Sequence, residues 1–190
     1  MKIFQIGFNK CGTSSLYHFF KGNGIASVHL DGFDDDSDDY FPCVHAYINY
    51  FTELDKQYPN SKFILNRRNL IKWIKSRQSH VFGSGRTYLG SYMHHMKMTE
   101  EEVLTLWENQ WNAHISNVLE YFKDRPNDLL VFNIEEDDAT KIKDFFSEDL
   151  DLDVSHWKQH NQTGSLIPIT ITEKAKKDKK GRIILWSRDD

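Results

Sequence analysis

Strand-like and helix-like segments alternate along this sequence, and this alternation limits the possible folds more than any other feature. The strand-like segments are short apolar runs at residues 2–6, 25–30, 62–66 and 128–134. The helix-like segments are amphipathic and occupy residues 14–24, 46–59, 69–80, 99–122 and 139–146. Such alternation predicts parallel βαβ units with helices on both faces of the sheet. We therefore expect an α/β fold, a three-layer sandwich around a central parallel sheet.

The longest predicted helix begins after Thr99, because Glu102 stands where a capping box places its acidic partner. The side chains expected on its buried face are Val103, Leu106, Trp107, Trp111, Ile115, Val118, Leu119 and Phe122. The glycine-containing segment 81–92 is predicted to be a loop or lid. The aspartate-rich segment 31–41 is predicted to be a solvated loop, since it lacks the spaced glycine and final glutamate of an EF-hand.

Composition limits the class of protein. A chain of 190 residues is long enough for one domain with a sizeable core, so we expect a single domain over residues 1–190. A net charge of −4 gives no reason to expect a nucleic-acid partner. No stretch approaches the roughly 18 to 20 apolar residues of a membrane span, and no secretory signal is recognisable. The two cysteines indicate a reduced compartment. We expect a cytoplasmic protein without a membrane partner; its oligomeric state is left open.

Residues 7–15, GFNKCGTSS, connect the first strand-like run to the first helix-like segment. Glycines let a backbone approach an anion, and the N–H groups at a helix start point toward it. Lys10 adds a point charge to this loop. Hydroxyl donors follow at Thr13, Ser14 and Ser15. The ATP-binding loop carries lysine directly after its second glycine, whereas Thr13 follows Gly12 here. We predict a phosphate-binding loop in a P-loop NTPase-like fold; a plain glycine turn with hydroxyl capping is the alternative.

A second basic group follows the strand-like run 62–66. Arg68 stands at the carboxyl end of that strand, the edge at which open parallel sheets bind ligands. Ser76 lies two turns along the next helix and can return toward the same anion, while Arg67 is predicted to point the other way. Two separate anion sites, one at Lys10 and one at Arg68, suit a nucleotide that is phosphorylated at two places.

These two motifs resemble those of the sulfotransferases that use 3′-phosphoadenosine-5′-phosphosulfate (PAPS). The stretch Lys10-Cys11-Gly12-Thr13-Ser14-Ser15-Leu16 is similar to the family's 5′-phosphosulfate loop, K-x-G-T-[ST]-[ST/W]-L. Arg68-Asn69 with Ser76 is similar to its 3′-phosphate motif. Residues 58–76, YPNSKFILNRRNLIKWIKS, look like the compact branch of the family. The resemblance spans about residues 2–162 and includes a late strand and helix and an asparagine at 161.

The resemblance implies transfer of a sulfuryl group from PAPS to an acceptor hydroxyl or amine, with 3′-phosphoadenosine-5′-phosphate (PAP) as product and no metal. Lys10 would act on the leaving phosphate. The 5′-phosphate would be held by Cys11, Gly12, Thr13, Ser14 and Ser15. Arg68 and Ser76 would hold the 3′-phosphate, and the acceptor would be a small molecule or a glycan. The late R-K-G loop of the cytosolic branch is absent; the basic segment 174–182 is interpreted as solvated, with closure of the nucleotide site as the alternative.

A general base must remove the acceptor's proton. In the cytosolic branch a histidine precedes the 3′-phosphate arginine at nearly the spacing at which His45 precedes Arg68, so His45 is the first candidate. Asp39, Glu53 and His29 remain alternatives, and His45 can instead have only a packing or capping role. Cys11 lies beside a lysine and near a helix start, both of which lower a thiol pKa, but a tolerated small side chain is preferred to a catalytic thiol.

Neither His80 nor the adjacent pair His94 and His95 has the ligand spacing of a metal site, so no metal is expected. Two other functions remain open. One is a P-loop nucleotide kinase with a displaced lysine, which magnesium-dependent ATP turnover would support. The other is a non-catalytic nucleotide-binding protein on the same scaffold, which would bind the nucleotide without transferring any group.

Overall fold

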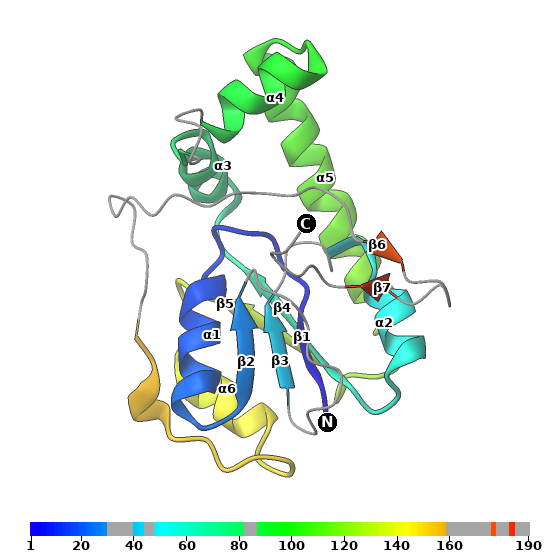
Figure 1. The fold of residues 1–190 in the computed structure, drawn as a ribbon, viewed down its shortest axis with the longest axis vertical. Coiled ribbons are helices and arrows are strands. Elements are labelled where there is room, and N and C mark those ends of the chain that lie inside the picture. Colours follow the sequence, from blue (N-terminus) through cyan, green and yellow to red (C-terminus); the bar gives the residue numbers. More distant parts are fainter. Residues whose placement is uncertain (30–39, 44–47, 82–86, 159–175, 178–182, 185–190) are drawn as a thin grey trace.

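The computed structural model describes residues 1–29, 40–43, 48–81, 87–158, 176–177 and 183–184 (Figure 1). Its strands are β1 Ile3–Gln5, β2 Ala26–His29, β3 Tyr40–Cys43, β4 Lys62–Arg67, β5 Leu129–Asn133, β6 Lys176–Lys177 and β7 Ile183–Ile184. Its α-helices are α1 Thr13–Gly22, α2 Phe51–Gln57, α3 Leu70–Gln78, α4 Tyr88–Met96, α5 Glu100–Tyr121 and α6 Ala139–Phe145, and a short 3-10 helix spans Val154–His156.

The central sheet is parallel, as the sequence predicted. β4 lies in its middle and pairs in parallel with β1 on one side and with β5 on the other. β2 and β3 form a second parallel pair, and β3 lies against β1, so the two sheets are neighbours. β6 and β7 form a separate antiparallel pair. The fold is therefore a mixed α/β fold built on parallel strands.

Helices pack on both faces of the central sheet because consecutive strand residues point to opposite sides (Figure 1). On one face, Ile3 and Ile64 belong to an apolar cluster completed by side chains of α1 and α6. On the other face, Phe4 and Phe63 belong to a cluster with side chains of α2 and α5. These strand residues are fully buried. Burial on both sides holds the carboxyl ends of β1 and β4 at one edge of the sheet.

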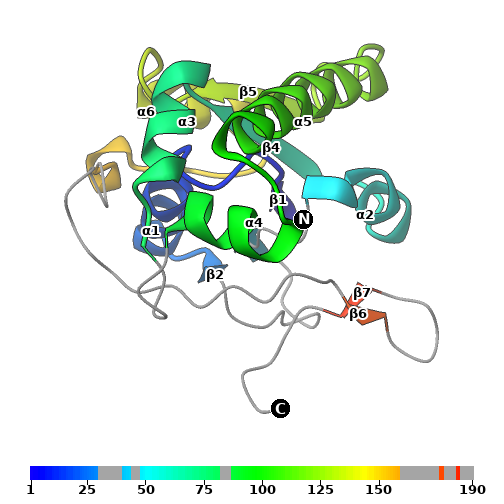
Figure 2. The same cartoon turned by 90° about the horizontal axis from the view of Figure 1, so that it is seen from above.

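A third apolar cluster lies beyond that edge. It joins Cys11 of the loop after β1 to large side chains of α3, α4 and α5. Its buried members are Cys11, Trp73, Tyr88, Val103, Trp107 and Trp111. Figure 2, seen from above, looks onto these three helices. These three helices cover the loop that carries Cys11. Among the described helices, none is long and apolar enough to cross a membrane.

Two sequence predictions about α4 and α5 need correction. The loop predicted for 81–92 is wrong from Tyr88 onward, because α4 begins there with the Thr87 hydroxyl accepting a hydrogen bond from Gly90 N at 3.0 Å. The capping box of α5 is confirmed. On α5 itself Leu119 is 42% exposed, not buried as predicted, and His114 lies on the buried face instead.

The segment predicted as a solvated loop, 31–41, lies mostly outside the described residues. Its last two residues belong to β3, a strand that the sequence analysis did not predict. The other predicted strands and helices are present, with boundaries shifted by a few residues.

Candidate functional site

The loop between β1 and α1 is held at both ends by Asn66 of β4. The Asn66 side-chain oxygen accepts a hydrogen bond from Gly7 N at 3.1 Å, and its amide nitrogen donates to the Cys11 carbonyl at 2.8 Å. Gln5 Nε2 also donates to the same Asn66 oxygen. Asn66 is 1% exposed, so these bonds are formed away from competing water. A single buried amide thus fixes the span of the predicted phosphate loop.

The two glycines of the loop are required by close packing. A Cβ added at Gly7 would lie 2.0 Å from the Asn66 carbonyl oxygen. Gly12 has a φ of 84°, and a Cβ there would lie 1.9 Å from Cδ1 of Ile134. A side chain at position 7 would clash with the backbone of β4, and one at position 12 would combine backbone strain with displacement of the Ile134 side chain.

The loop ends where α1 begins. Gly12 is the N-cap of α1 and provides no side-chain cap, so the positive end of the helix dipole lies at the end of the loop. Thr13 and Ser15 of the first turn are buried, and Ser14 is partly exposed. The backbone geometry is that of a helix start suited to an anion.

Lys10 has left-handed backbone geometry, with φ 66°, and its side chain meets His80. Lys10 Nζ lies 3.3 Å from His80 Nδ1. Burial, and then the charge of Arg68, lower the pKa of Lys10. Burial, and then the charge of Lys10, lower the pKa of His80 to about 4. From the sequence, His80 was considered only as a possible metal ligand; its contact with Lys10 joins residues far apart in the chain, which no local pattern indicates.

Arg68 follows β4 and contacts the loop directly. Its Nη1 donates to the Lys10 carbonyl at 3.2 Å, and its Nη2 lies 3.1 Å from Glu135 Oε1. The Glu135 carboxylate also accepts from Asn69 N at 2.9 Å and pairs with Lys72 at 3.0 Å. Although burial alone would raise it, these hydrogen bonds hold the pKa of Glu135 below its ordinary value. The structure therefore brings Arg68 to the loop, together with a carboxylate that the sequence analysis did not identify.

Ser76 is buried on α3, but among the described residues its hydroxyl makes no hydrogen bond to Arg68 or to the loop. Its neighbour Arg77 is buried against the rings of Trp73, Tyr88, Tyr92 and Trp107, at 4.6 to 5.5 Å from their centroids. Arg77 Nη2 also donates to the Tyr92 hydroxyl at 3.2 Å. Burial lowers the pKa of Arg77. Arg77 thus braces the helices that cover the loop.

Cys11 is enclosed by apolar side chains. Its side chain is fully buried in the third apolar cluster, and burial raises the pKa of its thiol, outweighing the nearby charges of Arg68 and Arg77. A raised pKa keeps the thiol protonated at neutral pH. Cys11 is therefore a packing residue of the loop, the interpretation that the sequence analysis preferred.

The candidate bases are largely outside the structural description. His45 and Asp39 lie outside the described residues, as does most of the basic segment 174–182. The backbone of His29 belongs to β2, but its side chain is not described. Glu53 lies on the exposed side of α2. The identity of the base remains a prediction from the sequence.

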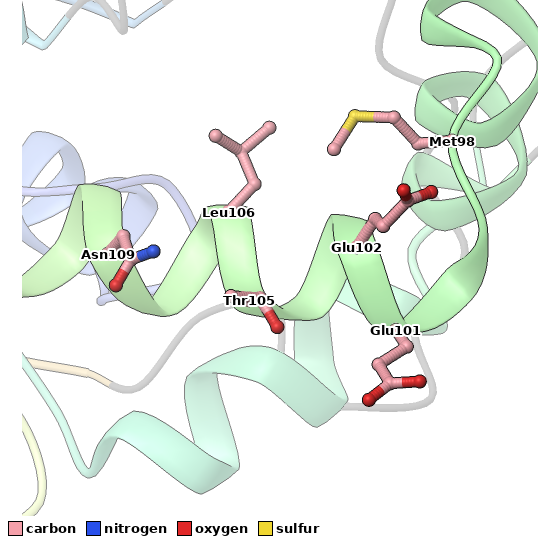
Figure 3. Close-up of a pocket in the computed structure, with 6 residues that line it drawn as sticks. All are labelled: Met98, Glu101, Glu102, Thr105, Leu106 and Asn109. Carbon is pink, nitrogen blue, oxygen red and sulfur yellow. The ribbon is translucent and has the colours of Figure 1, made fainter.

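One pocket of the described residues lies apart from this site. A pocket of about 420 Å³ lies along the first half of α5, where it is lined by Met98, Glu101, Glu102, Thr105, Leu106 and Asn109 (Figure 3). None of these residues comes from the loop or from α3. Within the described part of the chain, no three His, Cys, Asp or Glu side chains could hold a metal ion together.

Comparison with known families adds independent information. A family model described as a sulfotransferase domain matches residues 33–145, more than half of the chain. The match includes Arg68, Ser76 and Glu135 and begins after the loop that carries Lys10. Among curated proteins, no sequence matches this chain.

Proposed function

This chain belongs to the sulfotransferase domain family, and from that premise we propose that it transfers a sulfuryl group from PAPS to a hydroxyl or amine of a small-molecule or glycan acceptor. The observation that carries the proposal is the meeting of Lys10 and Arg68 at one loop, where Arg68 Nη1 donates to the Lys10 carbonyl at 3.2 Å. A nucleotide with phosphates at both its 5′ and 3′ positions can form charge-assisted hydrogen bonds with a cation at each phosphate. The proposal includes a single domain with a three-layer, P-loop NTPase-like architecture, which helices on both faces of the sheet support.

The residues at the loop fit such a nucleotide. Arg68 Nε is buried and has no hydrogen-bond partner in the part of the chain that the structure describes. Unpaired buried donors are costly, so a ligand oxygen would stabilise this one. Lys10 and the start of α1 add an ammonium group and a positive helix end at the same loop. Together these donors are complementary in sign of charge and in hydrogen bonding to the phosphates of such a nucleotide.

PAPS would supply a sulfuryl group attached to a phosphate leaving group. Lys10 donates a hydrogen bond where negative charge builds up on that phosphate, and it keeps its own proton. The N–H groups of the loop and the hydroxyls of Thr13, Ser14 and Ser15 hold and orient the 5′ end, while Arg68 holds the 3′ end. His45 is the proposed base, which takes the proton of the acceptor as the new O–S or N–S bond forms and the S–O bond to the phosphate breaks.

A transfer assay tests this proposal. Wild type is incubated with ³⁵S-labelled PAPS and panels of phenols, amines and glycans, alongside Lys10→Met and the matched variant Lys75→Met, which removes an exposed lysine of α3. Label should pass to at least one acceptor class with wild type and with Lys75→Met, and not with Lys10→Met. Equal transfer by Lys10→Met and wild type would contradict the assignment of Lys10.

A further inference from the structure

Lys10 has a partner of a different kind from those of the other cations near the loop. Its Nζ lies 3.3 Å from His80 Nδ1, and among the described residues no carboxylate lies within ion-pair distance of it. Arg68 and Lys72, by contrast, share the carboxylate of Glu135. The three N–H donors of a lysine ammonium allow one bond to His80 and two toward a ligand.

The imidazole of His80 is neutral at pH 7, because its pKa lies at about 4. A neutral ring can accept from Lys10 at Nδ1 only when its hydrogen is on Nε2. A neutral acceptor orients the ammonium without cancelling its charge, whereas a carboxylate would cancel much of it. Within the described part of the chain, the positive charge of Lys10 therefore remains for an anion at the loop.

The fold holds His80 at two backbone points. His80 lies just beyond the end of α3, and its backbone N donates to the Arg77 carbonyl at 3.3 Å. The His80 carbonyl accepts from the backbone N of Tyr88, the first residue of α4, at 2.9 Å. The His80 ring also lies 5.5 Å from the Tyr88 ring. The Tyr88 hydroxyl accepts a hydrogen bond from Asn9, the residue before Lys10. The His80 ring thus contacts the Lys10 ammonium and the Tyr88 ring, and the Tyr88 hydroxyl ties the start of α4 to the loop through Asn9.

We propose that His80 is a positioning residue, which holds the Lys10 ammonium at the loop so that it meets an anionic nucleotide. The nature of the nucleotide rests on the proposed function, whereas the contact between the two side chains does not. His80 is not proposed as the base. In-line transfer places the acceptor and the leaving oxygen on opposite sides of the sulfur, and His80 lies beside the lysine that serves the leaving side.

Nucleotide binding gives the first test. Calorimetry with PAP is done on wild type, His80→Ala, His80→Asn and the control His95→Ala, which removes an exposed histidine of α4. His80→Ala should bind PAP about tenfold more weakly, the usual worth of a hydrogen bond to a charged group. His80→Asn places an amide oxygen near the position of Nδ1 and should recover most of the affinity, and His95→Ala should match wild type. His80→Ala binding as tightly as wild type would overturn the proposal.

Nitrogen NMR of the histidine rings gives the second test, and it needs no nucleotide. His80 should be neutral at pH 7 with its hydrogen on Nε2. Lys10→Met should shift the Nδ1 resonance and raise the pKa of His80, since the lysine charge lowers it. An unchanged His80 signal in Lys10→Met overturns the positioning role. If the coupling is present but wild type does not bind PAP, the proposed function fails and the pairing of Lys10 with His80 stands.

Discussion

Lys10 and Arg68 are both cations at the same loop, but the side chains that they contact differ in charge. Lys10 is hydrogen-bonded to a neutral imidazole, while Arg68 is paired with the carboxylate of Glu135. Among the described residues, no carboxylate compensates the lysine charge. The Arg68 guanidinium is held between two acceptors, the Glu135 carboxylate and the Lys10 carbonyl. This difference is the basis for the division of roles in the proposed function, in which Lys10 would act on developing charge and Arg68 would hold the loop and one end of the ligand.

The largest effect is expected from Lys10→Met. Loss of a single donor aimed at developing negative charge costs about 10²–10³ in turnover. The rate of transfer from PAPS to an identified acceptor, measured beside Lys75→Met, checks this. An increase in KM for PAPS with kcat unchanged would instead mean that Lys10 only binds the nucleotide.

Arg68→Ala should weaken PAP binding by about 10- to 100-fold, which corresponds to about 1.5–3 kcal/mol for hydrogen bonds to a charged group. Arg67→Ala is the matched control, because it removes the neighbouring arginine without touching the Arg68 contacts. Calorimetry at one salt concentration gives both values. Equal weakening of PAP binding by the two variants would contradict the specific role of Arg68.

The loop geometry that joins the two cations depends on Gly12. Gly12→Ala should destabilise the fold by about 1–3 kcal/mol more than Gly24→Ala, since overpacking adds to backbone strain. Both glycines have positive φ, 84° and 78°, but a Cβ at Gly24 meets nothing within 4 Å, whereas one at Gly12 meets Ile134. Urea unfolding of the two variants measures the difference. Equal destabilisation would show that the contact with Ile134 carries no energy.

His80→Asp gives Lys10 a charged partner like that of Arg68. Beside His80→Asn, which has the same shape and no charge, it should bind PAP at least about fivefold more weakly, because a negative charge about 4 Å away costs about 1 kcal/mol in bulk water and more in a partly buried site. Calorimetry with PAP on His80→Asp and His80→Asn measures the effect of this charge on affinity. Equal affinities would remove the distinction between the two cations.

The last prediction concerns the free energy of unfolding as a function of pH. His80 has a folded pKa of about 4, below the 6.5 of an ordinary histidine, so the unfolded chain binds more protons between these values. The free energy of unfolding should therefore fall as pH falls from 6.5 toward 4. Chemical unfolding of His80→Asn across this range should give a shallower fall than wild type. His114, whose pKa burial also lowers, is present in both proteins and cancels in the difference. Identical curves would contradict the shifted pKa of His80.

The sequence predicted those features that local patterns determine. The strand, glycine loop and helix at the N-terminus follow one another directly, and Arg68 stands at a recognisable strand end. Asn66, His80 and Glu135 were missed, because their roles come from contacts with the loop or with Arg68 across the fold. No pattern in the neighbouring sequence distinguishes them from ordinary surface or strand residues.

The errors in α4 and α5 have similar causes. The glycines of 81–92 favoured a loop, but the Thr87 cap and the burial of Tyr88 against α3 and α5 stabilise a helix from Tyr88 onward. On α5, His114 is buried although it is polar, because its Nε2 lies 2.7 Å from the Ile6 carbonyl oxygen. A polar residue on an apolar face is not predictable from periodicity unless its distant partner is known.

Calorimetry of wild type with PAP, and with ATP and magnesium, tests the central claim most directly. The account predicts that PAP binds tightly without magnesium and that ATP with magnesium binds weakly, since the loop lysine and Arg68 match a nucleotide with phosphates at both ends. Tight binding of ATP with magnesium and none of PAP would contradict it and would favour a nucleotide kinase.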